Sequence, residues 1–207
     1  MIQAALLAAL ITKCAPQTDV RTLAAIVAVE SSGDAWAIRD PIADRAVHPT
    51  SYAQAVTTAR TLLLRGARVS VGLSQVLLPR RGLSSATLLG SPCANLHAGA
   101  TILTEAYTQQ IRLVGNPSSE MGQQAALRRA LSVYNSGTPN GSPEYAQRVL
   151  AALASPLVEE VTSIADGRRT SAAVPRHPSS PVVVAASKPK PVILTHASSV
   201  FFSDDVR

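Results

Sequence analysis

Aromatic side chains are scarce in this 207-residue sequence, where Phe, Trp and Tyr together make up 3% of the residues. A β-sandwich or barrel would normally need more of them, whereas the Ala, Leu and Val that supply the apolar content are compatible with helices. The scarcity of aromatics therefore favours an all-α, mainly helical fold. A chain of this length can hold one ordinary globular domain and an appended segment.

Cysteine is also scarce, because Cys14 and Cys93 are the only two. Two cysteines are too few for a disulfide-built miniprotein, and they have no CxxC spacing, so neither a zinc cluster nor a thioredoxin-type site is indicated. Their spacing alone leaves two alternatives open. They could form one long-range disulfide, which an oxidising compartment would permit, or remain two buried free thiols.

Long apolar runs are missing too, since none reaches the roughly 18–20 residues that a transmembrane helix needs. No transmembrane segment is therefore expected. The first twelve residues, MIQAALLAALIT, resemble the apolar part of a signal peptide, but no Lys or Arg precedes them and no convincing cleavage site follows. They fit a first amphipathic helix equally well.

Several motifs of common chemistry are absent. The sequence has no Gly-rich phosphate loop and no GxSxG elbow, and its histidines have no ligand spacing such as HExxH. No metal and no cofactor are therefore expected, and no role is assigned to the four histidines, which are His48, His97, His177 and His196.

The formal net charge is +6, and most of the excess lies before Ser155. Surplus positive charge favours anionic partners such as nucleic acid, lipid head groups or a cell-wall polymer that carries carboxylates. Nucleic acid is disfavoured among them, because the basic residues are scattered, aromatics are few and no predicted helix carries a basic stripe.

Apolar spacing and capping residues predict helices separated by irregular loops. Residues 34–50, with Asp40–Pro41 and His48–Pro49, are expected to form a loop or short hairpin, and 69–79 a compact apolar stretch. The expected helices after the N-terminal one cover 18–32, 51–66, 92–114, 120–134 and 142–154.

The composition changes after Ser155, where many prolines are interleaved with Ser, Ala and Lys. We therefore expect one domain over 1–155 and an extended or disordered Pro/Ser-rich tail over 156–207. Two stretches of the tail, VVVAAS and VILTHASSVFF, could add a strand to a partner's sheet. The alternative is a flexible solvated tail without such a role.

Glu30 is the first residue that suggests chemistry. On the predicted helix over 18–32 it shares a face with Leu23, Ile26 and Val27, and that face should be buried. A buried carboxylate either pairs with a cation or lies in a cleft with a raised pKa, and the second situation suits a general acid. A Glu near a helix end is more often a surface residue, so this feature needs support from its context.

Short segments in a fixed order give that context. Glu30–Ser31 is followed by Gly72–Leu73–Ser74–Gln75, then by Tyr134–Asn135–Ser136–Gly137 and Tyr145. This order resembles the lytic transglycosylases of the lysozyme-like superfamily. Cys14–Ala15–Pro16, the run from Thr22 to Ile26, and the segment PCANLHAG over 92–99 make the likeness nearest to the small peptidoglycan-cutting enzymes of type IV secretion systems. It covers about residues 3–152.

The resemblance implies a lysozyme-like domain, no cofactor, and a role for each matching residue. Glu30 would be the catalytic acid and base, Ser31 would hydrogen-bond near it, and Tyr145 would orient it. The cysteine-containing segments imply a Cys14–Cys93 disulfide. The implied substrate contacts are Ser31, Gly72, Leu73, Ser74, Gln75, Tyr134, Asn135 and Tyr145.

Two departures from the family pattern affect only these substrate contacts. Ser74 replaces the usual Met, and Leu77 stands where an Asn commonly follows Gln–Val, which would remove one polar sugar contact. Neither change affects the carboxylate.

The implied reaction cleaves the β-1,4 bond between N-acetylmuramic acid and N-acetylglucosamine and leaves a 1,6-anhydro sugar. The implied setting is the periplasm, where the protein would open the wall for a secretion system and contact its components through the tail. Two rivals remain. One is a non-catalytic wall-binding assembly factor of the same fold, and the other is a lysozyme-type hydrolase that uses Asp34 or Asp40 as a second carboxylate.

Overall fold

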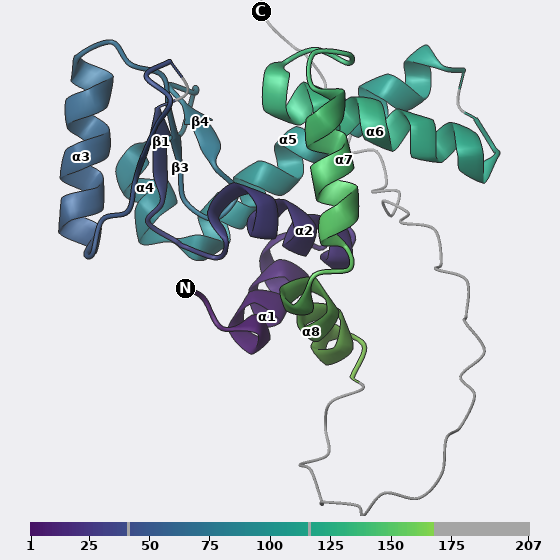
Figure 1. Ribbon diagram of the computed structural model, residues 1–207, viewed down its shortest axis with the longest axis horizontal. Helices are drawn as coiled ribbons and strands as arrows, with labels where there is room; N and C mark the ends of the chain where they lie inside the picture. The colour runs from purple at the N-terminus through teal and green to yellow at the C-terminus, as the bar shows by residue number, and fades with distance from the viewer. Residues whose placement is uncertain (41, 116, 168–207) are drawn as a thin grey trace, which may run out of the picture.

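The computed structural model describes residues 1–40, 42–115 and 117–167 (Figure 1). In this part of the chain the expected, mainly helical architecture is confirmed, and a small antiparallel sheet adds to it. None of the described helices is both long and apolar enough to cross a bilayer. The elements in chain order are α1 (Ala4–Cys14), α2 (Val20–Ser31), β1 (Ile38–Asp40), β2 (Arg45–Val47), α3 (Tyr52–Leu64), β3 (Val69–Val71), β4 (Val76–Leu78), α4 (Ser85–Gly90), α5 (Pro92–Leu113), α6 (Glu120–Ser136), α7 (Pro143–Ala152) and α8 (Pro156–Ala165).

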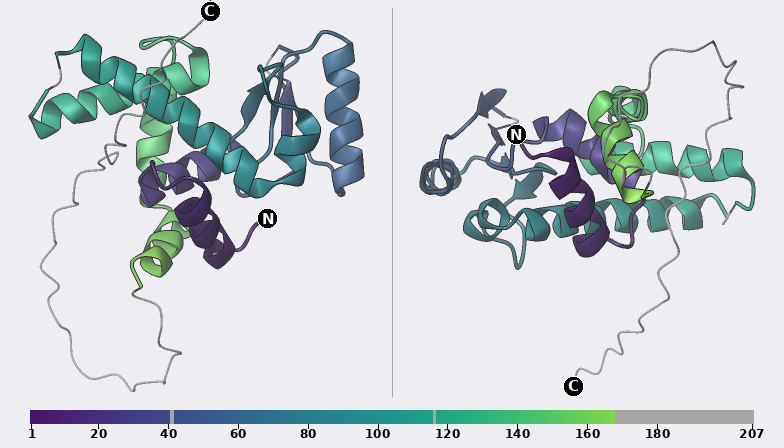
Figure 2. Two further views of the ribbon diagram at one scale, coloured as in Figure 1. Left: turned by 180° about the vertical axis from the view of Figure 1, so that it is seen from behind. Right: turned by 90° about the horizontal axis from the view of Figure 1, so that it is seen from below.

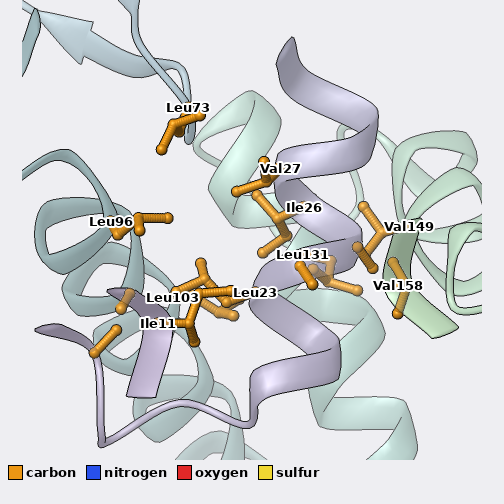
Figure 3. Packing of buried hydrophobic residues seen from close by; sticks show 14 of the residues in the cluster. Ile11, Leu23, Ile26, Val27, Leu73, Leu96, Leu103, Leu131, Val149 and Val158 are labelled. Atoms are coloured by element: carbon orange, nitrogen blue, oxygen red, sulfur yellow. The ribbon is translucent and has the colours of Figure 1, made fainter. Parts of the chain in front are cut away.

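The larger hydrophobic core lies among the helices, with α2 at its centre (Figure 3). Leu23, Ile26 and Val27 of α2 are completely buried, as their spacing predicts. The N-terminal residues form the amphipathic helix α1, which buries Leu7 and Ile11 in the same core. We call this part of the molecule the helical lobe.

Local signals in the sequence determine where α2 begins and ends. The Asp19 carboxylate accepts a hydrogen bond from the Thr22 backbone N–H at 2.9 Å and so caps the first turn. Ser32 and Gly33 both adopt positive φ and end the helix. Glu30 is therefore fixed in the last turn of α2.

A second, smaller core lies between the sheet and helices α3 and α4, and we call this part the sheet lobe (Figure 1). The strand order is β2-β1-β3-β4, and all pairs are antiparallel. Of the loop or short hairpin expected within 34–50, the β1–β2 pair is the hairpin. The β3–β4 pair was not predicted, because three-residue strands are too short to show a period of two in the sequence.

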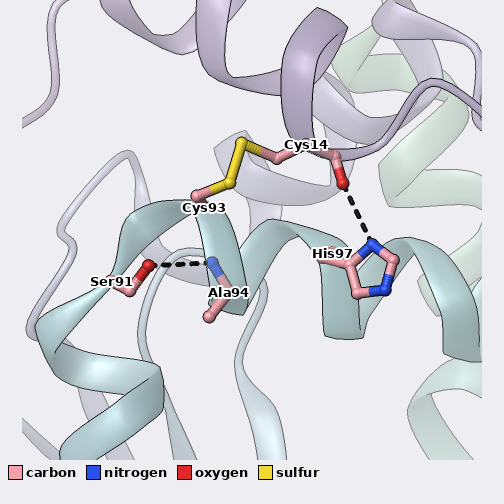
Figure 4. Close-up of a disulfide and its surroundings, with 5 residues drawn as sticks. All are labelled: Cys14, Ser91, Cys93, Ala94 and His97. Atoms are coloured by element: carbon pink, nitrogen blue, oxygen red, sulfur yellow. Dashed lines mark hydrogen bonds between the residues drawn. A yellow bond between two sulfur atoms is a disulfide. The ribbon is translucent and has the colours of Figure 1, made fainter.

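Helix α5 connects the two lobes (Figure 2). It contacts α4 and β4 in the sheet lobe and α1 and α6 in the helical lobe. The expected disulfide is present between Cys14, at the end of α1, and Cys93, in the first turn of α5 (Figure 4). His97 adds a polar contact nearby, because its Nδ1 lies 3.0 Å from the Cys14 carbonyl oxygen.

Helix α8 corrects the expected boundary at residue 155. Pro156 begins this helix instead of a tail, and α8 packs against α1 and α2. Val158 and Val161 are completely buried in the larger core. The change in composition at Pro156 misled the prediction, because proline is well tolerated in the first turn of a helix. The rest of the expected tail, 168–207, including VVVAAS and VILTHASSVFF, lies outside the described residues.

The packing of α8 predicts that its apolar face contributes to stability. Val158→Ala should lower the free energy of unfolding by about 1–3 kcal/mol, because it leaves a void in the larger core. Glu159→Ala, which removes the next side chain on the exposed side of the same helix, should change it by less than about 0.5 kcal/mol. Urea unfolding of the two variants would measure both values. Equal effects would contradict the packing of α8 described above.

Candidate active site

A cavity of about 960 Å³ lies between the two lobes. Its lining comes from the end of α2, the sheet, the middle of α5, the end of α6 and the start of α7. A second cavity of about 540 Å³ lies on the other side of α2's last turn. Glu30, Arg39 and Gln75 line both cavities, so Glu30 stands where the two meet.

The Glu30 carboxylate is half-buried and has one hydrogen-bond donor among the described residues. The Tyr145 hydroxyl donates to Glu30 Oε1 at 2.6 Å, and Tyr145 itself is buried at the start of α7. Burial raises the pKa of Glu30 above its ordinary value, while the Tyr145 hydrogen bond and the positive charges of Arg148 and Arg39 oppose that rise. The environment thus favours a protonated carboxyl group that also remains able to ionise.

Two tyrosines form a layer behind the carboxylate. The rings of Tyr134 and Tyr145 are stacked, with centroids 6.3 Å apart. The Tyr134 hydroxyl donates to the Ser74 carbonyl oxygen at 2.6 Å. Burial and the nearby Glu30 raise the pKa of both phenols, so both remain protonated donors. The Arg148 guanidinium lies 5.6 Å from the Tyr145 ring centre.

The turn over 72–75 places Gln75 at the junction of the cavities. Gly72 has φ +77°, and a Cβ there would lie 2.3 Å from Nδ2 of Asn95, so the turn requires glycine. Gln75 also has positive φ. Its Nε2 donates to the carbonyl oxygens of Ala37 and Gly72 at 3.0 and 2.9 Å, which holds its side chain in place.

The predicted substrate contacts at the end of α2 and in the turn over 72–75 are placed differently, because Ser31 lines the smaller cavity and three residues of the turn line neither cavity. Leu73 packs into the larger core, and Ser74 is completely buried, so neither they nor Gly72 line either cavity. The Ser31 hydroxyl donates to the Leu73 carbonyl oxygen at 2.9 Å and so joins α2 to the turn, with no hydrogen bond to Glu30. The turn is held between α2 and α5, and Gln75 is the one residue of the turn that lines the cavities.

The predicted Asn135 lines the larger cavity at the end of α6. Its Nδ2 donates to Ser142 Oγ at 2.8 Å, and Ser142 Oγ in turn donates to Glu144 Oε1 at 3.0 Å. Tyr134, Asn135 and Tyr145 therefore all lie beside the same cavity as Glu30. Their order in the sequence predicted this gathering correctly.

Sequence reasoning missed several residues that build the site. Asn95 is buried in α5, where its side chain accepts from the Ser74 N–H and donates to the Val71 carbonyl oxygen, both at 2.8 Å. Its place in the PCANLHAG segment was the available signal. The sequence contains no comparable signal for the arginines that line the larger cavity, because they are far apart in the chain. They are Arg39, Arg68, Arg80 and Arg148.

The candidates for a second carboxylate are placed differently. Asp40 accepts from the backbone N–H groups of Ile42 and Ala43 and holds the β1–β2 turn, and it lines neither cavity. Asp34 lines the smaller cavity together with Glu30, and its carboxylate lies 3.0 Å from the His48 ring. Of these two predicted alternatives, Asp34 alone shares a cavity with Glu30.

Fold and site together define a mainly helical protein with two lobes. The carboxyl group of Glu30 lies where two cavities meet, and burial raises its pKa. Comparison with known proteins identifies the relatives. The type IV secretion system protein VirB1 of Brucella suis biovar 1 is 39% identical over 150 residues, which are 67% of this chain and 60% of that protein. VirB1 of Agrobacterium fabrum is 33% identical over 127 residues, which are 60% of this chain and 49% of that protein.

The chain is therefore a homologue of the VirB1 proteins, and the family relationship predicted from the short segments is confirmed. It spans less than two thirds of the length of these relatives. No protein-family model matches the chain, and no solved structure matches it.

The burial of Glu30 predicts a pH-dependent cost to stability. Because its pKa is raised in the folded protein, the folded state binds more protons than the unfolded state, and stability falls as the pH rises above about 4.5 through the raised pKa. Glu30→Gln removes this cost, so its Tm should exceed that of the wild type by a few degrees at pH 8 and match it at pH 4.

Glu120→Gln removes an exposed carboxylate at the start of α6 and serves as the control, measured in the same thermal scans. It should not reproduce the gain at pH 8. A Glu30→Gln variant whose Tm follows that of the wild type at every pH would contradict the assigned burial.

Proposed function

We propose that this protein is a peptidoglycan lytic transglycosylase with Glu30 as its single catalytic carboxylate. The observation that carries the proposal is the hydrogen bond from Tyr145 to Glu30 Oε1 at the junction of two cavities. An extended glycan could lie through both cavities with one glycosidic bond beside Glu30. The homology with VirB1 proteins supports a role in a type IV secretion system.

The reaction begins with Glu30 in its protonated form, which burial favours by raising the pKa of its carboxyl group. Tyr145 donates to Oε1, which leaves Oε2 to carry the proton. Glu30 gives its proton to the glycosidic oxygen as the bond to carbon one of N-acetylmuramic acid breaks. The developing oxocarbenium ion is then attacked by another group.

The attacking group is the carbon-six hydroxyl of the same sugar, so the reaction needs no water and no second carboxylate. Glu30, now ionised, takes the proton of that hydroxyl, and the product is a 1,6-anhydro sugar. Nucleophile and electrophile belong to one ring, which supplies a large proximity advantage. The cations of Arg148 and Arg39 favour the ionised form that this second half of the reaction requires.

The setting we propose is the periplasm, where local cutting would open the wall for assembly of the secretion system. The described residues include the disulfide that such an oxidising compartment would maintain. The expected contacts of the segment 168–207 with secretion-system components remain part of this proposal.

Digestion of purified peptidoglycan tests the proposal. The wild type should release muropeptides with 1,6-anhydro ends, and Glu30→Gln should reduce their rate of release by about 10²–10⁴-fold, because it removes the only acid in the mechanism. Glu105→Gln, which removes another carboxylate from the lining of the same cavity, is the control and should retain most activity. Mass spectrometry of the products would distinguish the end groups.

Other products would point to the rival functions. Reducing ends without anhydro sugars, lost in Asp34→Asn, would identify a hydrolase that activates water with Asp34. Binding to peptidoglycan without any cleavage would identify a non-catalytic assembly factor. Either result would refute the proposed reaction.

Tyr145→Phe tests how Glu30 is tuned. Removing a hydrogen bond that lowers the pKa of Glu30 should raise that pKa, so the alkaline limb of the pH profile of kcat/KM should move to higher pH. The rate should also fall about 10–100-fold, because the carboxylate loses its orienting partner. Tyr52→Phe removes an exposed hydroxyl on α3 and should change neither quantity. A shift of the limb to lower pH would contradict this assignment.

A further inference from the structure

The face of the sheet that looks into the larger cavity differs sharply from the face that packs on α3 and α4. Arg39, Ser70 and Leu77 are partners across β1, β3 and β4, and all three line the cavity. The next row, formed by Ile38, Val71 and Val76, is buried in the smaller core, as alternation along a strand requires.

Two more arginines extend this exposed face. Arg68 immediately precedes β3 and lies two residues before Ser70, so the period of two along a strand places it on the same face of the sheet as Ser70. Arg80 follows β4. Both line the larger cavity. We call Arg39, Arg68 and Arg80 the basic face.

The cations of the basic face are held only weakly by the protein's own acids. Arg39 pairs with Asp44 at 2.6 Å, but both side chains are more than half exposed, and such pairs contribute little. Arg80 lies 3.9 Å from Glu105, and no ion pair is found for Arg68 within the described part of the chain. These guanidinium groups are therefore available to an anionic ligand.

Acidic side chains line the larger cavity as well. Glu105 on α5 lies beside Arg80, and Glu144 on α7 is accompanied in the lining by Arg148. The lining from α7 thus carries charges of both signs, whereas the three arginines of the basic face have Glu105 as their one ion-pair partner in the described lining. A ligand that carries carboxylates is therefore attracted to the sheet side of the cavity.

We propose that the basic face binds the free carboxylates of the peptide stems of peptidoglycan and makes the protein selective for peptide-bearing glycan. The inference rests on the proposed function. The sugar rings carry no charge of their own, and the lactyl carboxyl group is consumed in its amide bond to the peptide. The anionic groups that can pair with the guanidinium groups of the basic face are therefore the carboxylates of the peptide stems, which an arginine can bind through two hydrogen bonds.

Binding of Glu30→Gln, which leaves the polymer uncut, to three forms of peptidoglycan tests the proposal. The first is intact, the second has all its carboxyl groups converted to amides, and the third has had its stems removed by an amidase, which leaves only lactyl carboxylates. Intact material should bind about tenfold more tightly than the amidated form. Stem-free material should bind like the amidated form. Tight binding to stem-free material would assign the face to the lactyl carboxylate and overturn the proposal.

Paired variants in the Glu30→Gln background assign the effect to the basic face. Arg39→Gln with Arg68→Gln should abolish the preference for intact material, whereas Arg39→Lys with Arg68→Lys should keep most of it. Arg60→Gln with Arg65→Gln removes the same charge from the exposed surface of α3, away from both cavities, and should leave the preference unchanged. If both Gln pairs lost the preference for intact material to the same extent, net charge alone would explain the preference, and the proposal would be overturned.

Turnover separates this inference from the proposed function. Wild-type protein that releases anhydro-muropeptides equally fast from intact and amidated peptidoglycan would refute the basic face alone. Wild-type protein that binds intact material selectively but releases no anhydro products from any form would refute the proposed reaction and leave the binding result standing.

Discussion

The removal of one carboxyl group from water is the constraint on which the rest of the site depends. Glu30 is desolvated between two lobes, and a charge in that position is tolerated only because a buried tyrosine donates to it and two arginines lie near it. Glu30 and Tyr145 are 115 residues apart in the sequence. Their contact requires α2 and α7 to dock on one core, so the site exists only when the helical lobe is complete.

The remainder of the structure can be understood as support for this arrangement. Ser31 joins the end of α2 to the turn over 72–75, and Asn95 joins the same turn to α5. The turn therefore has two polar anchors on opposite sides, and the Tyr134 hydroxyl provides a third. These anchors hold Gln75 at the junction of the two cavities.

Much of this could be predicted from the sequence, and the failures have physical causes. Long helices were found because apolar spacing and caps such as Asp19 are local signals. Strands β3 and β4 were not predicted, because three residues are too few to show alternation, and α8 was not predicted, because the proline in its first turn also suits the start of an extended tail. Glu30, Tyr134, Asn135 and Tyr145 were gathered correctly because their order carried the information.

Contacts between distant segments were the part that the sequence did not reveal. Leu73 and Ser74 were expected at the cavity surface, but a motif shows only that a segment belongs to a site and not which of its side chains point inward. The arginines of the basic face come from different strands and turns, so only the folded sheet brings them together.

Helix α5 has a consequence for the width of the larger cavity. It is a single helix of 22 residues that contacts elements of both lobes and is bonded to α1 through Cys93. The separation of the lobes is therefore set by one continuous α-helix. A ligand in the larger cavity therefore lies between walls whose spacing this one helix maintains, because α5 lines that cavity and also contacts both lobes.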